Sequence, residues 1–246
     1  MVKYLKSNSK NVFYVGDIHG HYSELMRLLD LHQFNDSTDL LVCSGDLIDR
    51  GPESYQCLQL IDKPWFDAVI ANHELMAIHS KQHNYDGPTH AQWLSNGGLW
   101  FEKLDIQQRE HVDSLLVKLV TQSRPFIEID LDDATSRVGI VHAGIPKGFS
   151  WDDVRSSELS NDDLHKFIHT RIFNLENVNF VFETSPKELD MLIVGHNVIN
   201  SNMPQCFGKM VFADTGAGKH GNLTVHRHND LIELINLNDS AFALKP

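Results

Sequence analysis

The residues VFYVGDIHG at positions 12–20 and LLVCSGDLIDRG at positions 40–51 decide the fold. Each stretch begins with a short apolar run and continues into glycine and aspartate. Runs of this kind predict buried strands rather than half-exposed ones. Between them, residues 23–31 place their apolar side chains on one face of a helix, with Ser23 as the expected N-cap. Strand, helix and strand in this order predict a βαβ unit with parallel pairing.

The same pattern recurs along the chain. Strands are predicted at residues 12–15, 40–43, 67–71, 138–141, 191–194 and 210–213. Two further apolar runs, 126–131 and 231–237, could supply strands to another sheet. Residues 75–124 are expected to be mainly helical, and the residues after Asn238 are interpreted as a short polar tail.

Polar residues follow each of these six strands. In α/β sheets, ligands collect at the carboxyl ends of strands, so the pattern predicts one polar site. Its candidate metal ligands are Asp17, His19, Asp46, Asn72, His142 and His196. Oxygen and nitrogen ligands without thiolates suit Mn²⁺, Fe or Zn²⁺, and suit Mg²⁺ less well because of the imidazoles. Asp46 could bridge two ions about 3.5–4 Å apart, the spacing of two-metal hydrolases. Each aspartate alone is usually a cap or turn residue, but the conjunction at five strand ends favours metal.

Three residues beside this set suggest further roles. His73 follows Asn72 and could protonate a leaving alkoxide as general acid. Asp49 could hold that imidazole in the correct tautomer and favour its charged form. Arg50 offers a planar fork for phosphate oxygens. The plainer interpretation of Asp49 and Arg50 is a local salt bridge before the next turn.

Length, composition and charge limit the classes of protein to which this chain could belong. The chain has 246 residues, 41% of them hydrophobic, and a net charge of −12, which argues against nucleic acid as a main partner. No run approaches the ~20 apolar residues that span a membrane, and no secretory signal is visible, so a cytoplasmic protein is expected. Cys43, Cys57 and Cys206 show no CxxC spacing, which argues against a disulfide framework or thiolate zinc site. Without repeats or linkers, residues 1–246 are expected to form one domain. The oligomeric state is left open.

Three blocks resemble the signature of the phosphoprotein phosphatase family. They are GDIHG at 16–20, GDLIDRG at 45–51 and NHE at 72–74, in the family's order and at its usual spacing. The chain is also similar to the bacterial and bacteriophage branch typified by bacteriophage lambda protein phosphatase. That likeness rests on PWF at 64–66, WLSNGG at 93–98, WF at 100–101, DTGA at 214–217 and GNLT at 221–224. It covers about residues 12–224.

The resemblance implies an α/β fold of two mixed β-sheets packed as a sandwich and flanked by helices. It implies one metal ion held by Asp17, His19 and Asp46. A second ion would be held by Asp46, Asn72, His142 and His196. Water bridging the two ions would attack phosphorus in line.

The resemblance also assigns roles in catalysis. His73, paired with Asp49, would protonate the departing oxygen. Arg50 and Asn72 would bind the substrate phosphate together with Arg171, which falls where the family has its second phosphate-binding arginine. The flanks of Arg171 lack the expected Trp and Glu, so Arg124 and Arg155 are the substitutes.

Two further positions depart from the family pattern. Ala71 replaces a glycine before the NHE block, which is harmless only if that residue has negative φ. Asn197 follows His196 where Thr is usual, a change expected to affect the ligand's surroundings rather than the ligand. Residues 216–219 are interpreted as a turn after Asp214. The aromatic cluster of Trp93, Trp100 and Phe101 is interpreted as core packing.

The sequence therefore predicts a phosphomonoesterase with two divalent ions, Mn²⁺ first and Fe or Zn²⁺ as alternatives. A protein serine/threonine phosphatase, also acting on phosphotyrosine, is the leading function, with phosphorylated protein as substrate. A symmetrical diadenosine tetraphosphate hydrolase is the nearest rival, but that branch lacks an acid at the position of Asp49. Two more candidates are a small-molecule phosphatase and a catalytically inactive metal-binding module. Against the inactive module, no proposed ligand or acid is missing.

Overall fold

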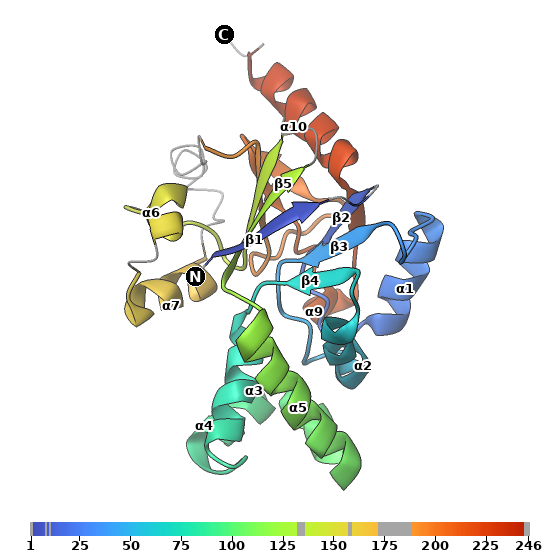
Figure 1. Cartoon of the computed structure of the whole chain (residues 1–246), viewed down its shortest axis with the longest axis vertical. Helices are drawn as coiled ribbons and strands as arrows, with labels where there is room; N and C mark the ends of the chain where they lie inside the picture. The colour runs from blue at the N-terminus through green and yellow to red at the C-terminus, as the bar shows by residue number, and fades with distance from the viewer. Residues whose placement is uncertain are drawn as a thin grey trace.

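The computed structural model describes residues 2–7, 9, 11–131, 136–156, 159–171 and 188–243. Two mixed β-sheets lie at its centre (Figure 1). The larger sheet contains, in spatial order, β1 (Val2–Ser7), β5 (Phe126–Leu131), β6 (Arg137–Val141), β7 (Met191–Val194), β9 (Met210–Phe212) and β8 (Gln205–Phe207). The smaller contains β10 (Val225–Arg227), β2 (Val12–Val15), β3 (Leu40–Cys43) and β4 (Phe66–Ala68).

The two sheets pack face to face. Along β2, side chains alternate between the two faces of the sheet, as the pleat requires. Val12 and Tyr14 share one buried cluster with Ile140 of the larger sheet, whereas Phe13 and Val15 belong to a second cluster on the helical side. The predicted sandwich of two mixed sheets flanked by helices is therefore confirmed.

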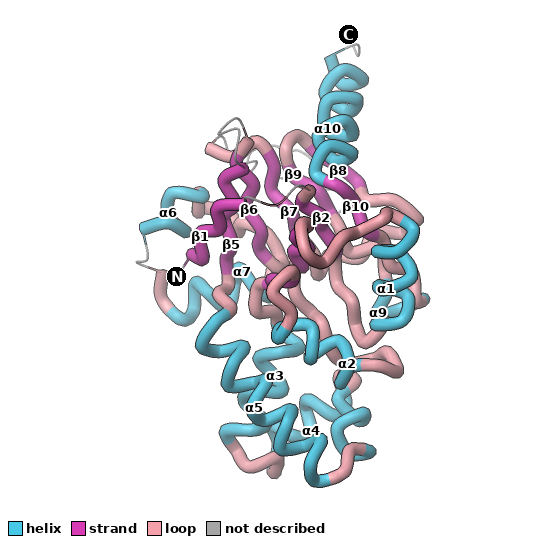
Figure 2. The backbone as a smooth tube through the Cα atoms, turned by 45° about the vertical axis from the view of Figure 1, so that its right-hand side comes forward, coloured by secondary structure: helices cyan, strands magenta, loops and turns pink. Residues whose placement is uncertain are grey.

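Helices cover the outer faces (Figure 2). They are α1 (Tyr22–Leu31), α2 (Ser54–Leu58), α3 (Asn72–Gln82), α4 (Gly87–Ser95), α5 (Ile106–Gln122), α6 (Trp151–Ser156), α7 (Asn161–His169), α9 (Ala217–His220) and α10 (His228–Ala243), with 3₁₀ turns η1 (Gln59–Asp62) and η2 (Gly98–Lys103). Helices α3, α4 and α5 gather at one end of the molecule, and α10 projects from the other. Among the helices of the described residues, none is long and apolar enough to cross a bilayer.

Parallel pairing brings the strand ends together. Strands β2, β3 and β4 are parallel, as are β6, β7 and β9, so within each group the carboxyl ends lie at one edge. A polar residue comes within two residues of the ends of β2, β3, β6, β7 and β9, whereas β4 ends at Ala68, earlier than the predicted strand 67–71, and Asn72 follows it after three apolar residues. The two edges face each other. The distance of 3.5 Å between Asp46 Oδ2 after β3 and His142 Nε2 after β6 demonstrates this.

Several sequence-based boundaries were wrong. Residues 231–237 lie in helix α10 instead of forming a strand, because Leu231 and Ile235 have helical spacing and are both buried against the sheet. The helix continues to Ala243, so the residues after Asn238 do not begin a polar tail. Strand β1 was not predicted.

Ser23 is not the N-cap of α1. The helix begins at Tyr22 with His21 at the cap position. The backbone N–H of Ser23 donates to Glu53 at 2.8 Å, and its hydroxyl donates to the same carboxylate. A carboxylate from another segment thus satisfies the helix start that Ser23 was expected to cap.

Candidate functional site

Asp46 occupies the centre of the predicted site. Its carboxylate is buried, and its Oδ2 lies 3.5 Å from both His19 Nε2 and His142 Nε2. Its other oxygen, Oδ1, accepts the backbone N–H of His73 at 3.2 Å. Residues from the ends of three other strands therefore converge on this one aspartate.

The two imidazoles are oriented by backbone carbonyls. His19 Nδ1 lies 2.9 Å from Ile48 O, and His142 Nδ1 lies 2.8 Å from Ser44 O. A carbonyl only accepts, so each Nδ1 holds the proton and each Nε2 presents a lone pair, as metal-binding histidines do. These lone pairs face the Asp46 carboxylate, which is itself an acceptor. A convergence of acceptors fits a cation between them.

Two groups of side chains lie close enough together to hold a metal ion. His19, Asp46 and His73 form one group, and Asp46, His142 and His196 form the other, with the ligand atoms of each group within 4.8 Å of one another. Asp46 belongs to both groups, as expected of a bridging ligand. Asn72 Oδ1 lies 2.9 Å from His142 Nε2, beside the second group.

Asp17 lies at the edge of these groups. Its two carboxylate oxygens accept the backbone N–H of His196, each at 3.1 Å, so in this structure it fixes the loop that bears His196. Burial raises the pKa of Asp17, and the charges of Asp214 and Asp46 raise it further. Asp214 was not among the predicted site residues. Three buried carboxylates so close together favour bound cations, because like charges without a counterion are costly in the interior.

His73 and Asp49 form a buried pair. His73 Nδ1 lies 2.7 Å from Asp49 Oδ2, and both side chains are almost inaccessible to solvent. Burial opposes the charged imidazole, but the carboxylates of Asp46 and Asp49 together raise the pKa of His73. Arg50 donates from its two terminal nitrogens to His19 Nε2 and His73 Nε2, each at 2.9 Å. The alternative of a local salt bridge between Asp49 and Arg50 is therefore not what the structure has: both side chains contact histidines across the site.

Backbone strain is concentrated at the site. Eight non-glycine residues of the described part of the chain have positive φ, and five of these are predicted site residues. They are His19, Asp46, Asp49, Arg50 and His196. Such conformations cost energy and persist where the surrounding structure imposes them, which occurs most often at functional sites.

Arg171 lies at the rim of the site. It is exposed and its Nη1 donates to His196 O at 3.2 Å. The two substitutes are engaged elsewhere: Arg155 pairs with the buried Glu128, and Arg124 donates to backbone carbonyls at the end of α5. Of the three arginines, Arg171 is the one beside the predicted ligands.

The two departures from the family pattern are accommodated. Ala71 has φ −119°, so the residue that replaces glycine has the negative φ it needs. Asn197 is buried, and its amide donates to Ala143 O at 2.8 Å. This bond connects the loop after His142 with the loop after His196.

Gly218 is a close neighbour that the sequence did not reveal. Residues 216–219 were interpreted as a turn, but Ala217–His220 form the short helix α9, with Gly216 at its N-cap, and this helix packs directly against the site. A Cβ atom on Gly218 would lie 2.3 Å from His19 Cδ2 and 2.8 Å from Arg50 Nη1. Only glycine allows this approach without displacing a site residue.

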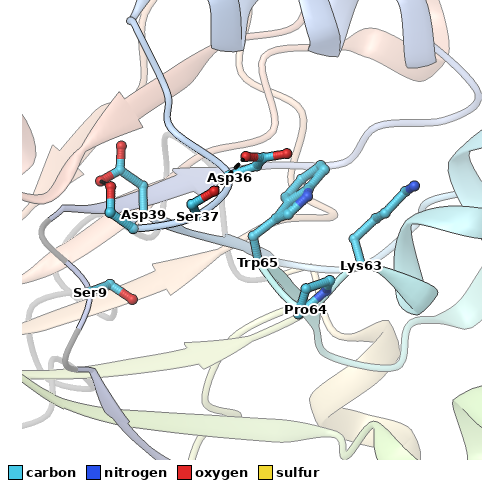
Figure 3. A pocket seen from close by; sticks show the side chains of 8 residues that line it. Ser9, Asp36, Ser37, Asp39, Lys63, Pro64 and Trp65 are labelled. Atoms are coloured by element: carbon cyan, nitrogen blue, oxygen red, sulfur yellow. Dashed lines mark hydrogen bonds between the residues drawn. The ribbon is translucent and has the colours of Figure 1, made fainter.

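A separate surface hollow of about 870 Å³ lies elsewhere (Figure 3). Asp39 and Trp65, which line it, immediately precede β3 and β4. It is therefore at the amino ends of these strands, away from the carboxyl-terminal edge where the predicted site residues gather.

Comparison with known proteins identifies the class. The chain resembles serine/threonine-protein phosphatase 2 of Salmonella typhimurium, with 32% identity over 232 residues that cover 91% of this chain and 97% of that protein. A symmetrical bis(5'-nucleosyl)-tetraphosphatase of Erwinia tasmaniensis is 32% identical over 144 residues, 58% of this chain and 46% of that protein. A crystal structure provisionally described as a diadenosine tetraphosphatase shares the fold with a TM-score of 0.62 at 20% identity, covering 93% of this chain and 94% of the other.

The fold, the site and these similarities define a metallophosphoesterase. Residues 10–220 match the calcineurin-like phosphoesterase family, and the chain belongs to that family. The bacterial protein phosphatase relative supports its membership of the phosphoprotein phosphatases, as the three sequence blocks predicted. The protein is thus a hydrolase of phosphoesters from a family that uses divalent metal ions.

Proposed function

We propose that this enzyme is a metal-dependent protein phosphatase that hydrolyses phosphoserine and phosphothreonine, and also phosphotyrosine. The pairing of His73 with Asp49 at 2.7 Å supports this most strongly. When an alkyl phosphate monoester is hydrolysed, its alcohol oxygen departs from phosphorus as an alkoxide, which is a poor leaving group unless it is protonated. A histidine held by a buried carboxylate is suited to supply it.

We propose that Asp17, His19 and Asp46 hold one divalent ion and that Asp46, Asn72, His142 and His196 hold the other. Mn²⁺ fits this mixture of oxygen and imidazole ligands, with Fe or Zn²⁺ as alternatives. When bound, such ions polarise phosphoryl oxygens and acidify water. In this structure His73, and not Asp17, belongs with His19 and Asp46 to the first group of potential ligands.

The residues of the chain account for the remaining steps. Arg50 would bind the phosphate, with Asn72 and Arg171 beside it, and its guanidinium already contacts His73 Nε2. A phosphate on Arg50 therefore places its ester oxygen near Nε2. Once the phosphate draws the guanidinium away from Nε2, this nitrogen can take up a proton from water; as the P–O bond breaks, that proton passes to the ester oxygen, and Nδ1–H stays bonded to Asp49.

A symmetrical diadenosine tetraphosphate hydrolase is the second candidate, favoured by the similarity to the Erwinia enzyme. The test is turnover of phosphoserine peptide, phosphotyrosine peptide, p-nitrophenyl phosphate and diadenosine tetraphosphate by one preparation reconstituted with Mn²⁺. We expect the highest kcat/KM for phosphopeptides and no activity after chelation. A higher kcat/KM for diadenosine tetraphosphate would reject the phosphatase assignment. Activity in metal-free protein would reject the metal mechanism.

A further inference from the structure

Two tryptophans contact the carboxylate that holds His73. Trp100 Nε1 donates to Asp49 Oδ1 at 2.8 Å, and Trp93 Nε1 lies 3.1 and 3.0 Å from Oδ1 and Oδ2. With His73 Nδ1 on Oδ2, three side-chain N–H groups surround one carboxylate that is 0% exposed. The interpretation of Trp93, Trp100 and Phe101 as core packing is confirmed, since Trp93 and Phe101 are buried in the core and Trp100 packs against it, but it leaves this contact with Asp49 out.

The chemistry of the indole suits this position. An indole N–H donates a hydrogen bond but neither accepts one nor carries a charge. It can therefore stabilise the Asp49 anion without competing for the proton of His73, whereas a cationic donor would repel a charged imidazole. Burial raises the pKa of Asp49, and the bonds from His73, Trp100 and Trp93 act in the opposite direction.

The indoles are held rigidly. Their rings meet edge to face at 86°, with centroids 6.0 Å apart. Gly97 O accepts the backbone N–H of Arg50 at 3.3 Å, which ties the corner between α4 and η2 to the loop that bears Asp49. A Cβ on Gly98 would lie 2.7 Å from the Trp93 ring, so this glycine allows the indole to lie flat against the backbone.

We propose that Trp93 and Trp100 are positioning residues that fix the Asp49 carboxylate and, through it, the orientation of the His73 imidazole. This inference rests on the proposed role of His73 as general acid. It assigns a function to the helical segment between α3 and α5, whose α4 and η2 supply the two indoles.

The test compares two substrates that differ only in leaving group. Phenyl phosphate needs a proton on its departing oxygen, whereas 2,4-dinitrophenyl phosphate releases a stable anion. The measured quantity is the ratio of kcat/KM for phenyl phosphate to kcat/KM for 2,4-dinitrophenyl phosphate. Because both values come from one preparation, the ratio does not depend on the fraction of folded enzyme.

Trp100→Phe and Trp93→Phe are each expected to lower this ratio about tenfold. This is less than the fall of about 100-fold or more expected when a general acid is removed altogether. Trp151→Phe is the matched control, because Trp151 is also buried and its Nε1 also donates to a carboxylate, that of Glu128. Its ratio should equal that of the wild type.

His73→Asn separates the two levels of the proposal. If His73→Asn lowers the ratio and neither Trp93→Phe nor Trp100→Phe does, the positioning role is wrong and the acid role stands. An equal fall in Trp151→Phe also refutes the positioning role. If His73→Asn leaves the ratio unchanged, the acid role fails and the positioning role falls with it.

Discussion

The buried carboxylate of Glu74 accepts the backbone N–H of Asp46 at 3.1 Å. It also accepts from Leu47 at 2.8 Å and from Ala71 at 3.2 Å. One side chain at the start of α3 thus joins the loop after β3 to the loop after β4. Since Asp46 has φ +49°, these bonds offset the strain in the residue proposed to bridge two ions.

Glu74→Gln is expected to destabilise the fold by about 2 kcal/mol, because the amide nitrogen cannot accept these N–H groups and leaves a buried donor unpaired. Urea unfolding measures the effect. Glu24→Gln is the control: Glu24 pairs with Arg27 on the surface of α1, and such pairs contribute little. Equal stability of Glu74→Gln and wild type would show that the Asp46 loop does not depend on this carboxylate.

Gly218→Ala is expected to weaken phosphate binding, because the new methyl group would displace Arg50 Nη1 or the His19 ring. A tenfold rise in KM, about 1.4 kcal/mol, is the predicted scale. Gly139→Ala crowds Leu189 and Trp151 in the core instead, so it should lower stability and leave KM unchanged. Steady-state kinetics that give Gly218→Ala a wild-type KM would contradict the close approach.

His73→Asn is expected to lower kcat for a phosphoserine peptide at least about 100-fold while metal content stays near that of the wild type. The variant removes the proton donor and keeps a polar side chain. His79→Asn, at an exposed position of the same helix, should retain full activity. Wild-type turnover by His73→Asn would remove His73 from the mechanism.

The stability of the fold should fall in acid partly through His226 in β10. Its Nε2 is buried without a hydrogen-bond partner among the described residues, and burial, aided by the charge of His32, lowers its pKa to about 4. In the unfolded chain a histidine titrates near about 6.5, so between these values the unfolded state binds more protons. The contribution of neutral His226 to the free energy of unfolding is complete above about pH 6.5 and is lost as the pH falls towards 4.

His226→Phe should therefore reduce the loss of unfolding free energy between pH 7.5 and pH 5 by about 2 kcal/mol. Urea unfolding at the two pH values measures it. His83→Phe, which removes an exposed histidine of the loop after α3, is expected to keep the wild-type difference. An identical pH dependence for His226→Phe and wild type would exclude His226 as a source of acid sensitivity.

The strands that form the site could be predicted from the sequence, because a short apolar run ending in glycine and aspartate has one structural interpretation. Strands β2 and β3 have the predicted bounds. The run at 231–237 does not have this property, since a short apolar segment fits a buried helix as well as a strand. Strand β1 contains Lys3, Lys6 and Ser7 among its six residues and shows no regular alternation, and its pairing with β5 depends on a distant segment.

The side chains at the strand ends were also predictable, because they lie beside their strands in the sequence. Those that act from a distance were not. The contacts of Trp93 and Trp100 with Asp49 and the close approach of Gly218 depend on how separate segments pack. A local sequence pattern does not predict where an N–H group points or how near another loop lies. For the same reason, the hydrogen bonds of Glu74 to the loop after β3 could not be predicted.

The central claim is that Asp46 joins two divalent ions, and anomalous diffraction from crystals grown with Mn²⁺ tests it most directly. The account predicts two anomalous peaks about 3.5–4 Å apart, with an Asp46 oxygen bonded to both. A single peak, or two peaks of which only one contacts Asp46, would contradict it.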